Sequence, residues 1–348
     1  MSGTEEKKVT LTHHKTGEKR EFTLRPFCCD DVKAVIQCVK DEYDDTYYRR
    51  EYYDEKLLVE MTESGGLYLY LACCGDELCG IQSIVSHAPE DTRLEAASQI
   101  FRKKFRGYGL PYELVKYTYD VARSLSPSSI YASTVVFHNI TASMCEDAGM
   151  VPVAFNLGSH ITSKMHNSYM LGNSEKYAQA ILILPVAKKD AGTVYVHSDI
   201  AGVVNRLYLQ LGVKADVKST YQATEDVAHL NPAALKVSVN EREQSVSIRV
   251  VETGPDLITR VREIMSSYTG ELWTFQLILP VDEPCAIREY EEVVKEGFFF
   301  AGLRPLCCEK EQIFMQNIRD VRFNFDEYVL TDRFRELLEE IQAIRGKK

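Results

Sequence analysis

The sequence lacks the cysteine spacing typical of metal and redox sites. None of its ten cysteines forms a Cys-x-x-Cys pair, and several stand next to each other, at Cys28 and Cys29, Cys73 and Cys74, and Cys307 and Cys308. Adjacent residues on a strand point to opposite faces, so such pairs do not converge on one metal ion. We therefore expect free thiols in a reducing compartment and no metal site.

Long apolar runs and a surplus of positive charge are also missing. No stretch of about 18 apolar residues occurs, which argues against a membrane span, and residues 1–20 have no apolar core of a signal peptide. The 41 Lys and Arg residues are outnumbered by 51 Asp and Glu residues, giving a formal net charge of −10. Because binding to nucleic acid depends on Lys and Arg, this balance argues against it. We expect a cytoplasmic protein with no membrane or nucleic-acid partner.

The residues that are present fit two soluble globular domains. The chain has 348 residues, of which 45% are hydrophobic and 26% charged. This length is long for one domain and sufficient for two. We predict a polar leader at 1–20, a first domain at 21–190 and a second, smaller domain at 191–348.

Hydrophobic periodicity predicts an α/β fold with mixed sheets in both domains. In the first domain, strands are expected at 21–25, 67–74, 78–87, 94–101, 130–137, 151–155 and 180–186, with helices at 32–43, 54–61, 111–125 and 139–148. In the second, strands are expected at 236–240, 246–252, 272–279, 298–303 and 313–318, with helices at 199–211, 256–267, 284–296 and 331–344. The element order β, β, α, β, α, β, β occurs in both halves, although no repeat is visible in the residues.

A glycine-containing loop separates the strand at 94–101 from the helix at 111–125. Its sequence is FRGYGLP at 105–111, preceded by Lys103 and Lys104. Glycines let the backbone approach a ligand closely, and the N-terminus of a helix favours an anion. A pyrophosphate is the natural ligand for this combination. The alternative is a turn that only leads into the helix.

Two segments resemble the GNAT superfamily of N-acetyltransferases. The loop resembles the family's pattern Arg/Gln-x-x-Gly-x-Gly/Ala, with Arg106 and Gly109 matching and Pro111, which has no N–H, at the final position. Residues 139–150, beginning at Asn139, resemble the pattern Asn-x-x-Ala-x-x-Leu-Tyr-x-x-x-Gly-Phe, with the closing glycine one position early. The resemblance covers about residues 22–186.

This resemblance implies an acyl-CoA N-acyltransferase fold, with acetyl-CoA as co-substrate and a small-molecule or peptide amine as acceptor. It also implies which residues hold the cofactor: Gln99, Ile100 and Phe101 on the strand, Arg106, Gly107, Tyr108, Gly109 and Leu110 in the loop, and Asn139.

Three residues are candidates for proton transfer. Glu95 lies on the strand that leads to the loop and is either the base or a solvated residue at the rim. Cys145 stands roughly where many relatives carry an acidic tyrosine, and either donates a proton or packs the helix. His138 precedes Asn139 and either acts through water or is structural.

The acceptor side and the second half leave several interpretations open. A cluster of tyrosines stands among acidic residues, which suits either binding of a cationic amine or simple helix packing. Its members are Tyr43, Tyr47, Tyr48, Tyr52 and Tyr53.

The second half has no glycine loop with basic residues, so we interpret it as a degenerate GNAT-like domain. Such a domain packs on the first, completes the acceptor site or forms a homodimer. The alternatives to an N-acetyltransferase are a non-catalytic acyl-CoA-binding or regulatory protein, and a transferase with another acyl donor or an oxygen acceptor.

Overall fold

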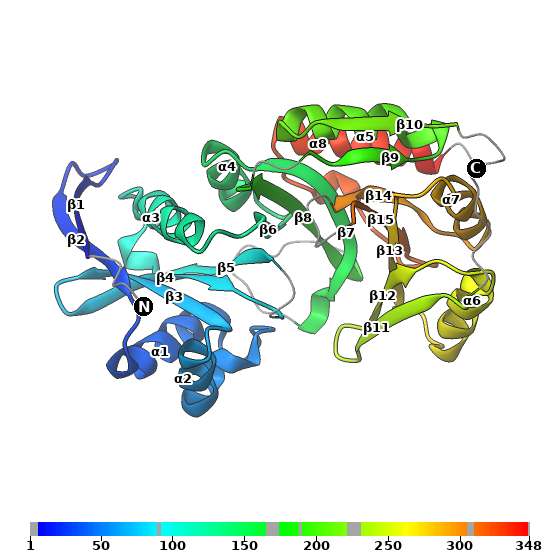
Figure 1. Ribbon diagram of the computed structural model, residues 1–348. Helices are drawn as coiled ribbons and strands as arrows, with labels where there is room; N and C mark the ends of the chain where they lie inside the picture. The colour runs from blue at the N-terminus through cyan, green and yellow to red at the C-terminus, as the bar shows by residue number, and fades with distance from the viewer. Residues whose placement is uncertain are drawn as a thin grey trace.

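One mixed sheet of thirteen strands runs through both halves of the chain (Figure 1). The computed structural model describes residues 6–88, 92–164, 174–187, 190–220, 231–304 and 310–346, so the pair Cys307 and Cys308 lies outside the described residues. The strand order is β1-β2-β3-β4-β5-β6-β8-β7-β14-β15-β13-β12-β11. The mixed α/β class that the sequence predicts is confirmed.

The sheet of the first half contains strands β1 (Lys7–Thr12), β2 (Lys19–Pro26), β3 (Leu67–Cys74), β4 (Glu77–Val85), β5 (Arg93–Phe101), β6 (Ser129–Val135), β7 (Val151–Ile161) and β8 (Lys176–Pro185). Its helices are α1 (Val32–Tyr43), α2 (Glu55–Glu63), α3 (Leu110–Ser124) and α4 (Ile140–Asp147). Only β5 and β6 pair in parallel, because α3 crosses over between them; the other neighbours are antiparallel.

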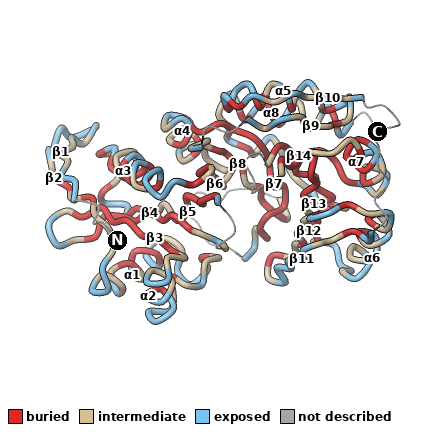
Figure 2. The backbone as a smooth tube through the Cα atoms, viewed as in Figure 1, coloured by how far each residue is buried: buried red, intermediate tan, exposed pale blue. Residues whose placement is uncertain are grey.

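Helices cover both faces of this part of the sheet, which explains why β3 is apolar along its whole length. Leu67, Leu69 and Leu71 pack with α1 and α2 in one core cluster, whereas Tyr70 and Ala72 pack with α3 in the other. Successive residues of a strand point to opposite faces. A strand between two helical layers must therefore be hydrophobic at both its odd and its even positions. Figure 2 shows the central strands buried and the outer helix surfaces exposed.

The second half repeats the strand order of the first in mirror image. Its strands are β11 (Ala234–Asn240), β12 (Ser245–Glu252), β13 (Thr274–Pro280), β14 (Phe299–Arg304) and β15 (Gln312–Asn317). Its helices are α5 (Ser198–Leu211), α6 (Leu257–Ser267), α7 (Ala286–Lys295) and α8 (Asp332–Arg345). The series β11-β12-β13-β15-β14 corresponds to β4-β5-β6-β8-β7, and each series has one parallel pair that a helix connects.

The two series meet where β7 pairs with β14. The contact pairs Ala154 with Gly302, and a Cβ on Gly302 would lie 2.2 Å from the carbonyl oxygen of Val153. Farther along β7, the fully buried Gln316 accepts a hydrogen bond from the backbone N–H of Leu157 (2.9 Å) and donates to Asn156 Oδ1 (2.9 Å). The side-chain amides of Gln316 and Asn156 thus connect the two halves beyond the backbone pair of β7 and β14.

Some elements differ from those that the sequence predicts. Residues 7–12, expected in a polar leader, form β1 and pair with β2. Helix α3 begins at Leu110, so Pro111 is its second residue and not its first. Two short strands that are absent from the expected elements, β9 (Gly192–Tyr195) and β10 (Ala215–Lys218), form a separate parallel pair. None of the described helices is long and apolar enough to span a membrane.

Candidate active site

A pocket lies where the parallel strands β5 and β6 separate. The two strands pair only over Arg93–Ala96 and Ser129–Ala132. Beyond these residues, β5 pairs with β4 and β6 pairs with β8, so a gap opens between them. The pocket in this gap is lined by both strands and by residues of α3, α4 and β8. It also receives side chains from the segment between α1 and α2, residues 44–54, which we call the tyrosine loop.

A β-bulge shapes the wall of the pocket on β5. Ile81 pairs with Ile100 and Ser83 with Ala97, which leaves two residues of β5 opposite the single residue Gln82. Ser98, in the bulge, has a positive φ of 52°. The phenol of Tyr47 donates a hydrogen bond to Ser98 Oγ at 3.2 Å. Bulges redirect side chains and are common beside active sites, and this one faces the tyrosine loop.

The glycine loop follows β5 and ends on the N-terminus of α3. Gly109 is the N-cap of this 15-residue helix and has a φ of 73°, a conformation in which glycine is not strained. It is exposed, and a Cβ placed on it would meet no atom within 4 Å. The space in front of the first turn of α3 is therefore open to a ligand, and the dipole of the helix favours an anion there.

The side chains of this loop are engaged elsewhere. Arg106 donates to Glu42 Oε2 at 2.9 Å, and Lys104 pairs with Glu77. The hydroxyl of Tyr108 donates to Glu18 Oε2 at 2.8 Å. The turn between β1 and β2 also holds the loop, because His14 donates its backbone N–H to the carbonyl oxygen of Gly107 at 2.9 Å. The backbone and the exposed Lys103 are thus what the loop offers to a ligand.

The other residues predicted to bind the cofactor lie at different places around the pocket. Gln99 lines it. Ile100, Phe101 and Leu110 are buried in the core, so only their backbone could contact a ligand. Asn139 is the N-cap of α4 and makes no side-chain capping bond, and it lies outside the set of residues that line the pocket.

Glu95 lines the pocket as a buried carboxylate between two basic groups. Arg49 Nη2 and His87 Nε2 each lie 2.6 Å from Glu95 Oε2. Burial alone would favour the neutral acid, but the charge of Arg49 and the hydrogen bond with His87 outweigh it and lower the pKa of Glu95 to about 2. A carboxylate held in this way is a weak base. Its position suits it to holding Arg49 by an ion pair. Because Arg49 belongs to the tyrosine loop, this ion pair also holds the loop beside the pocket.

His138 and Cys145 both line the pocket, with opposite consequences for proton transfer. Burial lowers the pKa of His138, so its imidazole is neutral at pH 7 and can accept a proton. Burial raises the pKa of Cys145 to about 11. A thiol of this pKa is a weaker acid than an ordinary thiol, whose pKa is about 8.5. Cys145 also lies 3.4 Å from the hydroxyl of Tyr119, in a packed position.

Four residues in or beside the pocket are not among those predicted from the sequence. Tyr119 of α3 and Tyr177 of β8 line the pocket, and Arg49 and His87 hold Glu95. For Arg49, its position within the tyrosine-rich stretch was an available signal. Of the predicted tyrosine cluster, Tyr43, Tyr47 and Tyr48 line the pocket. Tyr52 is instead fully buried in the core, and Tyr53 is half-buried outside the pocket.

The corresponding place in the second half is packed against the segment before β11. There, β12 and β13 are the parallel pair and α6 is the crossover helix. A Cβ on Gly254, just before α6, would lie 2.3 Å from the backbone nitrogen of Ala233. Asp256, the N-cap of α6, accepts a hydrogen bond from the same nitrogen at 2.7 Å. Two hollows lie nearby, and acidic side chains outnumber basic ones in both. The first is lined by Glu252, Asp282 and Glu283 with Lys310, and the second, at the start of α6, by Glu289 and Glu292 with Arg288. This excess of negative charge disfavours a phosphate.

Comparisons with known proteins give structural similarity only. No family model and no curated protein matches the sequence. A mutant of the spermidine N-acetyltransferase SpeG from Vibrio cholerae is 14% identical and covers 48% of this chain and 95% of its own, with a TM-score of 0.39. YncA, a putative acetyltransferase from Salmonella typhimurium solved with acetyl-CoA, is 13% identical over 49% of this chain and 96% of its own, with a TM-score of 0.40.

A putative acetyltransferase of the GNAT family from Desulfovibrio desulfuricans is 16% identical and covers 48% of this chain and 99% of its own, with a TM-score of 0.37. Each of these three structures covers about half of this chain, at 16% identity or less.

Proposed function

We propose that the first half of the chain is an acyl-CoA-dependent N-acetyltransferase domain whose acceptor is a small-molecule or peptide amine. The observation that carries the proposal is the separation of β5 from β6 into a pocket, with the open N-terminus of α3 at the end of β5. An extended acyl thioester with a pyrophosphate fits this combination, because the gap admits a chain and the helix terminus favours the phosphates.

The residues of the pocket suggest how the proton would move. Acetyl-CoA would supply an acetyl group whose bond to sulfur is exchanged for a bond to the amine nitrogen. His138, neutral at pH 7, would accept the proton that the amine loses and return it to the leaving sulfur. Glu95 would stay ionised and hold Arg49. Cys145 would remain protonated throughout, because its pKa is about 11.

A second candidate function is acyl-CoA binding without transfer. The ion pair that keeps Glu95 from acting as a base favours it. So does Pro111, which contributes no N–H to the first turn of α3. The two functions differ in whether a bound acyl-CoA is consumed.

The test begins with calorimetric titration of the purified protein with acetyl-CoA. We expect binding in the micromolar range, followed by acetylation of at least one member of an amine panel, detected by mass spectrometry of the product. Binding without any acetylated product would favour the second candidate. Absence of binding at millimolar acetyl-CoA would reject both.

A further inference from the structure

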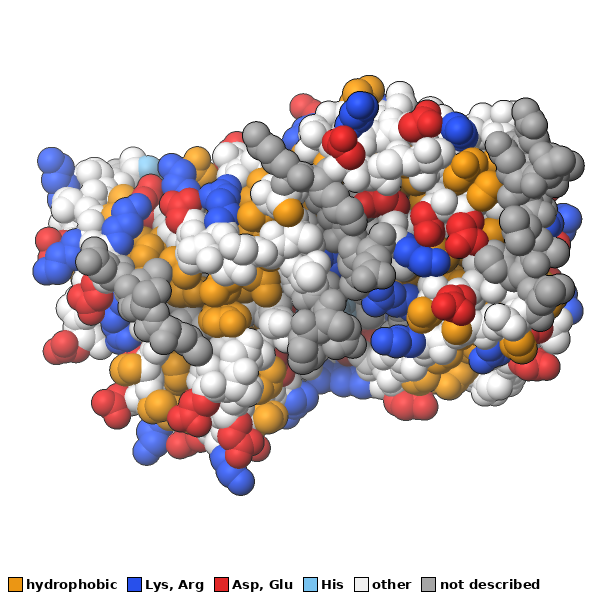
Figure 3. All heavy atoms as spheres, viewed as in Figure 1, with side chains coloured by type: hydrophobic (Ala, Val, Ile, Leu, Met, Phe, Trp, Pro, Cys, Tyr) orange, Lys and Arg blue, Asp and Glu red, His pale blue; other side chains and the backbone are white. Residues whose placement is uncertain are grey.

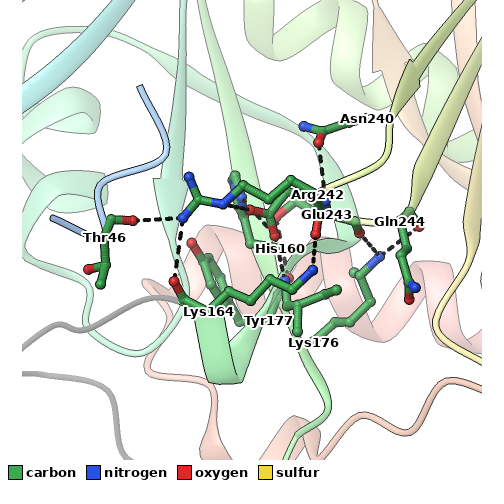
Figure 4. A network of polar contacts seen from close by, with 12 residues as sticks. Thr46, His160, Lys164, Lys176, Tyr177, Asn240, Arg242, Glu243 and Gln244 are labelled. Carbon is green, nitrogen blue, oxygen red and sulfur yellow. Dashed lines mark hydrogen bonds and ion pairs between the residues drawn. The ribbon is translucent and has the colours of Figure 1, made fainter. Parts of the chain in front are cut away.

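The tyrosine loop is in contact with the second half of the chain through the turn between β11 and β12. This turn, residues 241–244, reaches across to the first half where β7 ends and β8 begins (Figure 4). Arg242 Nη2 donates a hydrogen bond to the carbonyl oxygen of Thr46 at 3.0 Å. Tyr47 and Tyr48, the next two residues, line the pocket. A side chain of the second half therefore holds the backbone that presents these tyrosines.

The turn itself is fixed by buried polar contacts. Lys176 of β8 is fully buried, and its ammonium donates to the carbonyl oxygens of Glu243 (2.7 Å) and Gln244 (3.1 Å) and to Thr274 Oγ1 (3.1 Å). Burial lowers the pKa of Lys176 to about 8, so the ammonium is still mostly protonated at pH 7. Glu243, also buried, accepts a hydrogen bond from the backbone N–H of Ile161 at 2.8 Å.

A second path runs from the turn to the pocket through aromatic rings. His160 Nδ1 lies 3.8 Å from Glu243 Oε2. The ring of His160 stacks on Tyr177, with centroids 5.0 Å apart, and contacts Tyr48 at 4.9 Å. Tyr48 and Tyr177 both line the pocket. Figure 3 shows Lys and Arg side chains gathered in the lower middle of the view, where the halves meet.

We propose that the turn of residues 241–244 positions the tyrosine loop against the pocket. Arg242 is the positioning residue, because it holds the backbone of the loop at Thr46. Glu243 supports the loop indirectly, because it lies beside His160, whose ring contacts Tyr48. The described residues that line the pocket all belong to the first half, so the second half acts on the acceptor side by positioning the tyrosine loop. The glycine loop and α3 lie outside this set of contacts with the turn. This assignment of the acceptor side rests on the proposed function. It predicts that disturbing the turn loosens the tyrosine loop and leaves the cofactor side unchanged.

The experiment compares the full-length protein with Arg242→Ala by amide hydrogen exchange. We expect exchange of peptides covering residues 46–54 to rise about tenfold, since a hydrogen bond from a charged donor is lost, while peptides covering residues 105–115 are unchanged. Arg242→Lys should restore part of the protection. Arg262→Ala is the matched control, because Arg262 pairs with Glu296 on an exposed surface of the second half.

Titration of the same variants with acetyl-CoA separates the two proposals. We expect Arg242→Ala to bind acetyl-CoA within twofold of the parent protein. Protection of residues 46–54 equal to that of the parent and of Arg262→Ala would overturn the positioning role, whatever the titration gives. A parent protein that does not bind acetyl-CoA would reject the proposed function, and the exchange result would still decide whether the turn holds the loop.

Discussion

At the scale of single residues, Glu95 couples the pocket to the stability of the fold. Its pKa of about 2 lies below the ordinary value of 4.5, chiefly because Arg49 and His87 offset the effect of burial. A carboxyl group with a lowered pKa in the folded state stabilises the protein above its unfolded pKa. That contribution is lost as the pH falls from about 4.5 toward 2.

Glu95→Gln should therefore reduce stability at pH 7 and flatten its dependence on pH. The parent should lose on the order of 3 kcal/mol between pH 5 and pH 2 from this group, measured by urea unfolding across that range. The variant should also retain acetyl-CoA binding. A variant whose unfolding free energy falls as steeply with acid as that of the parent would show that Glu95 is not held ionised by Arg49.

His138 gives a second test at the scale of one residue. If its neutral imidazole accepts the amine proton, transfer should fall on the acid side with a midpoint below the ordinary histidine pKa of 6.5, because burial lowers the pKa of His138. His138→Gln should slow transfer by about 10²-fold or more while acetyl-CoA binding is kept. An unchanged rate, or an acid limb that persists in the variant, would remove His138 from the mechanism.

At the scale of elements, the glycine loop and α3 show what local sequence can predict. The loop and the helix after it follow from glycine positions and hydrophobic periodicity, which act within a few residues. The ion pair of Glu95 with Arg49 joins residues 46 positions apart, and the bond from Arg242 to Thr46 joins residues 196 apart. Such contacts depend on the strand order of the whole sheet, which no local pattern specifies.

The same limit explains the differences within elements. Strand β1 lies at the edge of the sheet, and its alternation is limited to two apolar residues, Val9 and Leu11, between exposed polar ones. So short a pattern inside a charged stretch does not distinguish a strand from a polar leader. Strands β9 and β10 have four residues each, and their pairing depends on α5, which connects them. The buried Lys176 could not be predicted, because the oxygens that satisfy it come from the other half of the chain.

The open end of α3 yields a prediction about this element. Gly109→Glu should abolish acetyl-CoA binding, because it places a negative charge where the pyrophosphate would lie. Gly109→Ala is the matched control: it carries the same backbone strain at a φ of 73° without charge, and its Cβ meets no neighbour. We expect Gly109→Ala to bind within about tenfold of the parent. Equal titration curves for the parent and Gly109→Glu would place the phosphates elsewhere.

At the scale of the whole molecule, the contact between β7 and β14 determines whether the two halves unfold together. Gly302→Val would force a side chain against the carbonyl oxygen of Val153 at a φ of 141°. We expect a loss of about 3 kcal/mol or more, with calorimetry showing two thermal transitions where the parent shows one. The outer position Gly192→Val is a control for positive φ, since a Cβ there meets no atom within 4 Å. One sharp transition in Gly302→Val would mean that the remaining contacts, among them those of Gln316 and Lys176 and the packing of α8 on β7, suffice to join the halves.

The mirror-image order of the sheet also has a consequence for how the molecule meets its surroundings. A sheet that ended at β7 would present unpaired backbone groups to other chains, as any edge strand does. Here β7 of the first half pairs with β14 of the second, so each half covers an edge strand of the other. The edges left at the ends of the sheet are β1, which begins with Lys7 and Lys8, and β11, which exposes Lys236 together with Val237 and Val239. Charge on an outer strand discourages further strand pairing. The duplication therefore removes the edge at β7 and leaves outer strands that each carry lysine, with β11 the more apolar of the two.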